Sequence, residues 1–328
     1  MKISVIGDGG WGTALALVLH RNGHRVCVWG PFSDYIEEIQ KKSENPKFLP
    51  DISIPPEIHW TSDCEEAVIN AGIVLVVIPS KYYRQTLELF TNLIPPSCQI
   101  LSATKGLDKQ THKRMSKTAQ EVLKRESVAV LSGPSHAQEV AKSIPAAVTI
   151  ASDDPDSAKT LQDTFTHNLF RIYTSEDIIG VELGGALKNV MAIAAGVCDG
   201  IGFGDNTKAA LLTRGLAEMT RLGCAMGAQP STFSGLSGMG DLIVTCTSKL
   251  SRNRTVGERI GRGESIDEIL GPMEQVAEGV WNCRNAKELA QEIGIEVPIT
   301  DEVYAVVHEG KDPRIAVQSL LARDPRPE

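Results

Sequence analysis

Residues 3–12 read ISVIGDGGWG, and this stretch decides the fold of the first half of the chain. Its first four residues are mostly apolar and β-branched, which predicts a buried strand. Residues 7–12 then match GxGxxG and lead into a helical pattern over residues 13–19. A second strand pattern follows at residues 25–29, so the motif lies in the strand, loop, helix and strand order of a βαβ unit.

The glycines of this motif have separate physical roles. Gly7 permits a tight turn after the strand, and Gly9 lets backbone N–H groups approach a pyrophosphate, while Gly12 lets the helix pack on the strand. The start of the helix adds a partial positive charge that attracts phosphates. We therefore predict a dinucleotide-binding loop, and we favour it over a glycine-rich turn without a ligand because the flanking strand and helix patterns are both present.

The first half as a whole alternates short apolar runs with helical patterns. This alternation predicts an α/β fold with a doubly wound, Rossmann-type sheet, and several of the runs are unbroken, as is typical of parallel strands covered on both faces. The predicted strands are 3–6, 25–29, 73–78, 99–102, 128–131 and 146–150, with 169–173 as a further candidate; the predicted helices are 11–22, 34–42, 62–70 and 111–124.

The second half is helical in pattern and punctuated by glycine and proline. We expect residues 1–177 to form a dinucleotide-binding domain and residues 178–328 to form an all-helical substrate and catalytic domain. The helices predicted here are 177–198, 208–222, 254–262, 280–293, 297–308 and 315–321.

Charge and composition limit the function. Thirty-three Lys and Arg residues face 41 Asp and Glu residues, and the net charge of −8 argues against nucleic-acid and membrane-surface binding. Residues 73–78, the most apolar run, are too short to cross a bilayer. The seven scattered cysteines contain no CxxC pair, and no secretory leader pattern opens the chain, so we expect no metal site, no disulfide framework and a cytoplasmic location. A small anionic substrate stays compatible with this charge.

The end of the second strand leaves the choice between NAD and NADP open. An NAD-preferring site places Asp or Glu there to bind the ribose 2′-hydroxyl. This chain has Gly30 and Pro31 instead, with Asp34 slightly further on, and it offers no clear arginine for a 2′-phosphate.

Residues 182–189, ELGGALKN, lie inside the first long helix of the second half. Gly184 and Gly185 each cost about 1 kcal/mol of helix propensity relative to alanine, which indicates that something approaches this helix closely. Lys188 lies one turn further on, and an enclosed lysine can lower its pKa and exchange protons with a substrate oxygen. On spacing alone, a solvated lysine on an interdomain helix is the more common arrangement.

Two further segments of the second half carry candidate polar groups. Asp241 follows the glycine-rich residues 235–240 and either orients a cation or substrate hydroxyl or caps a helix. Ser251 is a candidate helix start beside Arg252, and an arginine fork next to free N–H groups suits a phosphate monoester. Ordinary surface arginines on a capped helix are an equally good interpretation.

Two loops of the first half follow predicted strands. Lys105 lies in ATKG at residues 103–106, and residues 133–137 read GPSHA. Ligands of doubly wound sheets bind at these carboxyl ends, although each loop could also be a plain strand-to-helix turn. His136 alone indicates no role.

Taken together, these segments closely resemble the bacterial NAD(P)-dependent glycerol-3-phosphate dehydrogenase family, from Gly7 to about Leu320. The matching stretches are GDGGWGTALA, NPKFLP, SATKG, SGPSHA, VELGGALKNV, GLSGMGDL, TCTSKLSRNR and QVAEGV. Three positions depart from the family pattern: Gly10 replaces Ser or Asn, Phe48 replaces Tyr, and Pro31 stands where many members carry a basic residue.

The resemblance implies reduction of dihydroxyacetone phosphate to sn-glycerol 3-phosphate by NADH or NADPH, with Lys188 as the proton donor and a nearby Lys105 keeping its pKa low. The implied catalytic residues are Lys188, Lys105, Asp241, Asn189 and Thr245. The implied substrate-binding residues are Lys105, Gly133, Ser135, Lys188, Asp241, Ser251, Arg252 and Asn253. The implied cofactor-binding residues are Gly7, Gly9, Gly10, Trp11, Gly12, Pro31, Phe48, Lys105, Ala137, Arg252, Val276 and Glu278.

The resemblance further implies a cytoplasmic homodimer that supplies glycerol 3-phosphate for phospholipid synthesis. Two alternatives stay open at this point. One is a related dehydrogenase acting on a 3-hydroxy acid or a sugar-acid phosphate, since arginine also binds carboxylates. The other is a dinucleotide-sensing regulatory protein without turnover.

Overall fold

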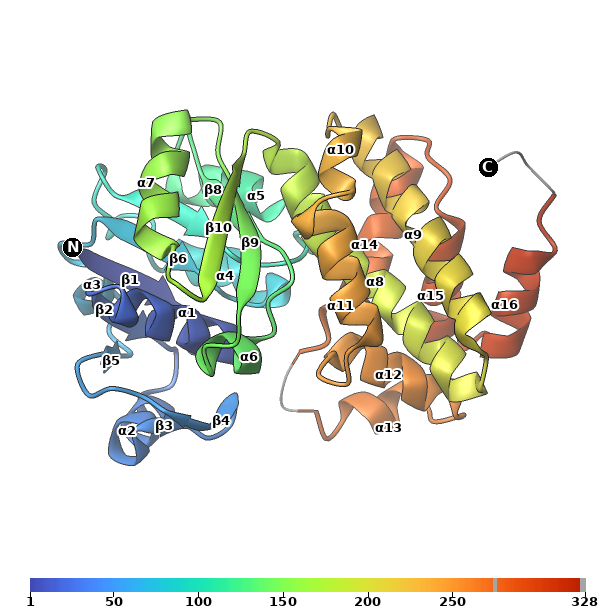
Figure 1. Ribbon diagram of the computed structural model, residues 1–328, viewed down its shortest axis with the longest axis horizontal. Helices are drawn as coiled ribbons and strands as arrows, with labels where there is room; N and C mark the ends of the chain where they lie inside the picture. Colours follow the sequence, from blue (N-terminus) through green and yellow to red (C-terminus); the bar gives the residue numbers. More distant parts are fainter. Residues whose placement is uncertain (274–275, 325–328) are drawn as a thin grey trace.

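Two bodies of different architecture lie side by side along the long axis of the molecule (Figure 1), a sheet covered by helices and a bundle of helices. The structure is a computed structural model, and it describes residues 1–273 and 276–324. The first body ends with β10 and the second begins with α8, so the change of architecture falls at residues 176–177. The N-terminus and the last described helix lie at opposite ends of the molecule (Figure 1).

The first body contains an eight-stranded sheet in the order β10-β9-β8-β7-β6-β1-β2-β5. A short antiparallel hairpin of two further strands lies outside it. The sheet strands are β1 (Lys2–Ile6), β2 (Arg25–Trp29), β5 (His59–Thr61), β6 (Ile73–Val76), β7 (Gln99–Ser102), β8 (Ala129–Ser132), β9 (Ala146–Ala151) and β10 (Phe170–Ser175), and the hairpin strands are β3 (Glu44–Asn45) and β4 (Leu49–Ser53).

All seven predicted strands are confirmed, including the candidate at residues 169–173. Six strands run parallel, but β9 is antiparallel to β8, and β10 follows the direction of β9. The antiparallel step means that β9 starts at the edge where β8 ends, so the GPSHA loop stays at the carboxyl edge of the parallel strands. Neither β5 nor the β3–β4 hairpin was predicted, because β3 and β5 have only two and three residues and the sequence LPDIS of β4 contains no apolar run.

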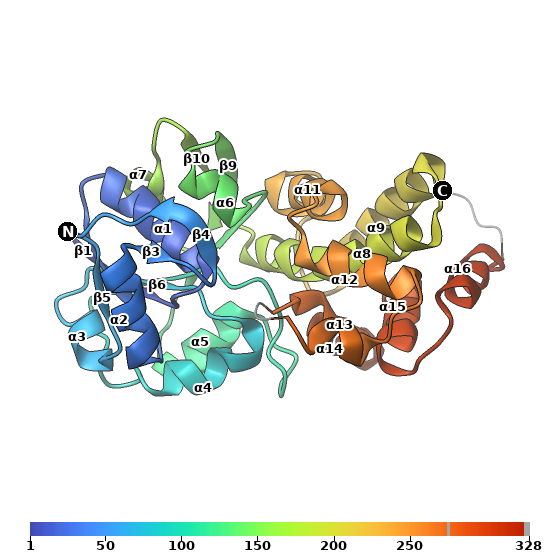
Figure 2. The same ribbon diagram turned by 90° about the horizontal axis from the view of Figure 1, so that it is seen from below.

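Helices cover both faces of the sheet, as a doubly wound fold requires. Figure 2 shows α1, α6 and α7 on one side and α3, α4 and α5 on the other, and each set packs on its own apolar cluster of strand residues. The helices of this body are α1 (Gly10–Arg21), α2 (Ser33–Lys42), α3 (Cys64–Val68), α4 (Tyr83–Glu88), α5 (Met115–Leu123), α6 (Ala137–Ala141) and α7 (Pro155–Phe165), with a 3₁₀ turn at Ser80–Tyr82.

Helices α4, α6 and α7 were not predicted, and the predicted helices at α3 and α5 are longer than the observed ones. The miss at α7 had a readable signal, because Asp154 caps the helix through the N–H of Asp156 and Pro155 occupies its first turn. The loop before α5 is a turn closed by Asp108, whose carboxylate accepts the N–H groups of Gln110 and Thr111.

Every secondary-structure element of the second body within residues 178–273 and 276–324 is helical, as predicted. Its helices are α8 (Ile178–Ile201), α9 (Asp205–Ala225), α10 (Pro230–Phe233), α11 (Asp241–Thr247), α12 (Arg252–Gly261), α13 (Ile266–Leu270), α14 (Glu278–Glu292), α15 (Pro298–His308) and α16 (Pro313–Leu321), and a π-helical turn, η2, spans Leu236–Gly240. The short helices α10, α11 and α13 were not predicted.

Helix α8 is the centre of this bundle, and α9, α11, α12 and α14 pack around it (Figure 1). Its length and apolar composition would suffice to cross a membrane, yet 83% of its most apolar window is buried inside the protein. Asp177 caps its start by accepting the N–H of Gly180 at 2.8 Å. The same carboxylate accepts the hydroxyl of Thr232, which ties α8 to α10.

Candidate active site

The GxGxxG loop has the shape expected of a dinucleotide cradle. Gly7 has a φ of +128°, and a Cβ there would lie 2.3 Å from the carbonyl oxygen of Val77. A Cβ on Gly12 would lie 2.1 Å from the Gly7 carbonyl oxygen, so the first turn of α1 can touch the loop only without a side chain. Nothing lies within 4 Å of a Cβ built on Gly9, the residue before α1. The loop therefore fits a pyrophosphate at the helix N-terminus.

Several other residues expected at the cofactor lie around this loop. Gly10 faces the carbonyl oxygen of Phe48 at 2.5 Å from its built Cβ, with the Cβ of Ala137 at 3.8 Å. Trp11 packs edge-on against Phe170, and its indole nitrogen is buried without a partner among the described residues. Pro31 is exposed directly after β2. These positions agree with cofactor binding.

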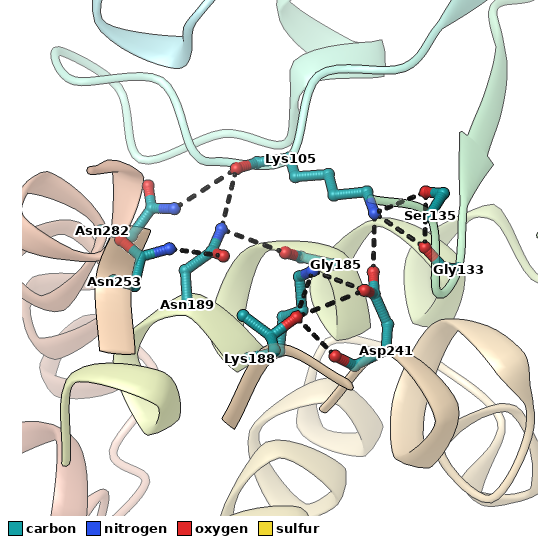
Figure 3. Close-up of polar contacts among 10 residues, drawn as sticks. Lys105, Gly133, Ser135, Gly185, Lys188, Asn189, Asp241, Asn253 and Asn282 are labelled. Carbon is teal, nitrogen blue, oxygen red and sulfur yellow. Dashed lines mark hydrogen bonds and ion pairs between the residues drawn. The ribbon is translucent and has the colours of Figure 1, made fainter. Parts of the chain in front are cut away.

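Lys188 and Asp241 form the polar centre of the site. The Lys188 ammonium donates to Asp241 Oδ1 at 2.5 Å and to Thr245 Oγ1 at 2.7 Å, while Lys105 Nζ donates to Asp241 Oδ2 at 2.7 Å (Figure 3). Lys188 is 6% exposed and Asp241 only 1%. The solvated-lysine alternative is therefore wrong, and Asp241 orients two cations instead of capping a helix with its side chain.

The face of α8 that carries Gly184 and Gly185 has no side chains at these two positions, which explains how Lys188, Asp241 and Lys105 come together. A Cβ on Gly184 would lie 2.4 Å from the carbonyl oxygen of Ser237 in η2. A Cβ on Gly185 would lie 2.4 Å from Ser132 Oγ at the end of β8. The close approach predicted from the paired glycines is confirmed, and it brings the carboxyl edge of the sheet and the start of α11 to the same turn of α8.

Burial sets the charge balance of this cluster. Burial is the largest cause that lowers the pKa of Lys188 to about 8, with Lys105 lowering it further and Asp241 opposing both. Burial alone would raise the pKa of Asp241, but Lys105 and Lys188 together hold it below its usual value. The expected repulsion from Lys105 is present as a secondary cause. An amine with this pKa can give and take protons near neutral pH.

Lys105 joins the two loops at the carboxyl edge of the sheet. It follows β7, and its Nζ donates to the carbonyl oxygen of Gly133 at 2.8 Å, with Ser135 Oγ at 3.5 Å. The Ser135 hydroxyl donates to the same carbonyl oxygen at 2.9 Å. Gly133 has a φ of +138° and lies against Val148, which fixes the turn after β8. All three predicted residues therefore meet beside Asp241 (Figure 3).

Asn189 and Asn253 are connected to each other. Asn253 Nδ2 donates to Asn189 Oδ1 at 2.9 Å, and Asn253 Oδ1 accepts the N–H of Gly279 at 2.9 Å. Asn189 Nδ2 and Asn282 Nδ2 both point to the carbonyl oxygen of Lys105 at 3.4 Å (Figure 3). Asn282 was not predicted, since no motif marks its position on α14.

At the start of α12, the structure agrees with the predicted helix start at Ser251 and with an arginine beside it that can bind an anion. Ser251 caps α12, because its hydroxyl accepts the N–H of Arg254 at 3.2 Å. The side chain of Arg252 is exposed and has no hydrogen bond to any described residue. Arg252 is therefore available to bind an anion, while the Ser251 hydroxyl is already engaged.

Glu278 binds the first body. Its carboxylate accepts the N–H of Ser80 at 2.8 Å and also the Ser80 hydroxyl, and burial raises the pKa of Glu278 above its usual value. Val276 lies in the irregular segment before α14, and Gln275, at the start of the QVAEGV stretch, lies outside the described residues. Within residues 1–273 and 276–324, no group of three metal-ligating side chains comes together, and every cysteine is free.

Comparison with known proteins agrees with this geometry. The family model of the NAD-dependent glycerol-3-phosphate dehydrogenase N-terminus matches residues 2–158, and the model of its C-terminus matches residues 177–318. Glycerol-3-phosphate dehydrogenase (NAD(P)+) of a Thermoanaerobacter species is 49% identical over 328 residues, covering 100% of this chain and 99% of its own. The corresponding protein of Geobacillus thermodenitrificans is 47% identical over 330 residues, covering 100% of this chain and 96% of its own.

A solved structure shows the same likeness. The crystal structure of glycerol-3-phosphate dehydrogenase from Coxiella burnetii superposes with a TM-score of 0.95 at 39% identity, covering 98% of this chain and 99% of that one. Both family models together span most of the chain, and the relatives match it over nearly their whole length. The chain therefore belongs to the NAD-dependent glycerol-3-phosphate dehydrogenase family.

Proposed function

We propose that this chain reduces dihydroxyacetone phosphate to sn-glycerol 3-phosphate with NADH or NADPH. The observation that carries the proposal is the buried Lys188–Asp241–Lys105 cluster, which lies at the carboxyl edge of the sheet where a dinucleotide binds. The full-length relatives bear the name of this activity. In this proposal residues 1–177 bind the cofactor, and residues 178–328 provide the catalytic amine and most of the substrate contacts.

Proton transfer is assigned to Lys188. When bound, the reduced nicotinamide supplies the hydride for C2 of the ketone. Lys188 Nζ donates a proton to the oxygen that becomes an alkoxide, and its positive charge stabilises that oxygen as charge develops. Asp241 keeps the ammonium pointed in one direction, because it accepts from both lysines. Thr245 supports Asp241 and Lys188 through the same hydroxyl.

Phosphate binding is assigned to Arg252 at the start of α12. A guanidinium fork without a hydrogen-bonded protein partner, at the start of a ten-residue helix, suits a phosphate monoester. Anchoring the phosphate there positions the carbonyl carbon and reduces the entropy lost in reaching the transition state. Asn253 and Ser251 hold the segment, and Ser135 and Gly133 complete the opposite wall.

Oxidation of added NADH or NADPH, followed by absorbance with dihydroxyacetone phosphate as substrate, tests the proposal. The Lys188→Ala variant should lose at least ~10²-fold in turnover, the scale of general acid catalysis, while its affinity for NADH stays unchanged. Lys159→Ala, which removes an exposed lysine on α7, is the control and should behave as wild type.

A panel that includes 3-hydroxy acids and sugar-acid phosphates decides between this proposal and its alternatives. Faster turnover of any of them would overturn the substrate assignment. Binding of NADH without turnover of any ketone would favour the dinucleotide-sensing alternative. Near-normal turnover in Lys188→Ala would remove that residue from the mechanism.

The cellular setting follows from the family resemblance. The enzyme is cytoplasmic, it acts on a small phosphorylated substrate with NAD or NADP as cofactor, and its product enters phospholipid synthesis. The chain forms a homodimer, so sedimentation should give twice its mass of 35.4 kDa. A mass equal to one chain would contradict the dimer.

A further inference from the structure

The carboxylate of Asp8 lies at the end of β2, where the sequence itself has no acidic residue. Asp8 is the second residue of the GxGxxG motif and follows β1. Its Oδ2 lies 2.5 Å and its Cγ 2.7 Å from the point where a Cβ on Gly30 would be, directly after β2. In dinucleotide-binding folds, the acidic side chain that hydrogen-bonds to the adenosine ribose normally lies at that strand end. Here a carboxylate from the neighbouring loop occupies the same place.

The surroundings of Asp8 hold it in this position. The N–H of Gly7 donates to the carbonyl oxygen of Trp29 at 2.9 Å, which keeps the loop beside the end of β2. Asn45 Nδ2 donates to the carbonyl oxygen of Asp8 at 2.7 Å and fixes its backbone. Gly30 has no side chain, so the Asp8 carboxyl group fits against its Cα.

The Asp8 carboxylate is available as an acceptor. No salt bridge joins it to a described cation, and no described side chain donates a hydrogen bond to it. Burial raises its pKa to about 6, with its own backbone N–H and the charge of Lys47 opposing that rise. At neutral pH the Asp8 carboxyl group is therefore mostly ionised and half-buried. It has no hydrogen bond from a described side chain that would have to break before it could bind a ribose hydroxyl.

We propose that Asp8 selects NADH over NADPH, because its carboxylate accepts hydrogen bonds from the adenosine ribose hydroxyls and repels a 2′-phosphate. The inference rests on the proposed function only for the identity of the cofactor class. In this proposal the choice between NADH and NADPH is made by the glycine loop. The residues after β2, Gly30 and Pro31, do not make that choice.

Equilibrium binding of NADH and of NADPH to the full chain, followed by nicotinamide fluorescence without ketone, tests the inference. Wild type should bind NADH roughly tenfold or more tightly than NADPH, the scale of a hydrogen bond to a charged group. Asp8→Ala should reduce that ratio by a similar factor. Gly30→Ala keeps the carboxylate but displaces it, and should also reduce the ratio. Asp34→Asn, at the start of α2, is the control with an unchanged ratio.

Three results would overturn the inference. They are tighter binding of NADPH by wild type, an unchanged ratio in both Asp8→Ala and Gly30→Ala, or an equal loss in Asp34→Asn. Because Gly30→Ala leaves Asp8 in the chain, the test remains decisive if the Asp8→Ala variant does not fold. Turnover of dihydroxyacetone phosphate by wild type is measured separately and tests the proposed function. Its result does not affect the ratio of the NADH and NADPH dissociation constants, which tests the inference.

Discussion

At the scale of single residues, the chemistry of this site depends on how deeply Lys188 is buried. A lone ammonium in that position would lose its proton, because desolvation disfavours the charged form. Asp241 offsets this loss through one oxygen and binds Lys105 through the other. One buried carboxylate thus serves two cations, so the cluster keeps a net positive charge that suits an anionic substrate.

The pH dependence of the reaction should report the pKa of Lys188, which burial lowers to about 8. Reduction needs the protonated amine, so kcat/KM for the ketone should fall as pH rises through about 8. Oxidation of glycerol 3-phosphate needs the neutral amine, so its kcat/KM should rise over the same range. Initial rates in both directions from pH 6 to 10 measure this.

The Asp241→Asn variant provides the matched test of that assignment. Since Asp241 raises the pKa of Lys188, removing its charge should move the inflection for reduction to lower pH. A shift to higher pH, or an inflection that stays in place while turnover persists, would contradict the assignment to Lys188.

Arg252 should contribute to substrate binding more than to the chemical step. The Arg252→Ala variant should raise KM for dihydroxyacetone phosphate roughly 10- to 100-fold, the scale of charge-assisted hydrogen bonds, with a smaller change in kcat. Arg262→Ala, which removes an exposed arginine just after the same helix, is the control. An unchanged KM in Arg252→Ala would argue against a phosphate anchor.

At the scale of elements, glycines set the distance between α8 and α12. A Cβ on Gly257 would lie 2.0 Å from the carbonyl oxygen of Ile193, and one on Gly196 would lie 2.0 Å from that of Arg254. The two helices therefore touch backbone to backbone. This contact places the start of α12, with Arg252, beside the catalytic turn of α8.

The Gly257→Ala variant should separate the two helices and lower the free energy of unfolding by about 1–3 kcal/mol, the usual cost of overpacking. Urea unfolding followed by circular dichroism measures the loss. Gly72→Ala, at an exposed position where a Cβ would make only ordinary van der Waals contacts, should change stability by no more than about 1 kcal/mol. Equal stability of wild type and Gly257→Ala would show that the contact is looser than described.

At the scale of the whole molecule, polar contacts join the two bodies both within the active site and beside it. Glu182 on α8 accepts the N–H of Ser116 at 2.7 Å and its hydroxyl at 2.6 Å, and it pairs with Arg114 at 2.5 Å. Lys105 and Asp241 make the second connection. Charged groups that are mostly buried thus join the two bodies both at the active site and at the start of α5, in addition to the contact of Glu278 with Ser80.

The Glu182→Ala variant should be destabilised by about 3–5 kcal/mol, because it leaves Arg114 buried without its partner. Chemical unfolding of the full chain measures this difference. Glu121→Ala, which breaks an exposed pair with Lys113, should cost no more than about 1 kcal/mol. Equal losses in the two variants would mean that the Arg114–Glu182 pair does not join the bodies as described.

What the sequence determined by itself is local: the strand, glycine loop and helix of residues 3–19, the alternation that follows, and the long apolar pattern of α8. These features depend on periodicity and on backbone freedom at a few glycines, so neighbouring residues suffice to read them. The paired Gly184 and Gly185 even predicted a close contact with α8, but not which segments of the chain make that contact.

Only the tertiary structure decided which distant groups meet. Lys188 is enclosed because Asp241, 53 residues away, reaches it, and sequence spacing favoured a solvated lysine instead. The reversal of β9, the Asn189–Asn253 bond and the place of Asp8 over Gly30 have the same origin. Burial and charge pairing are properties of packed surfaces. The pattern of residues along the sequence does not show which surfaces pack together.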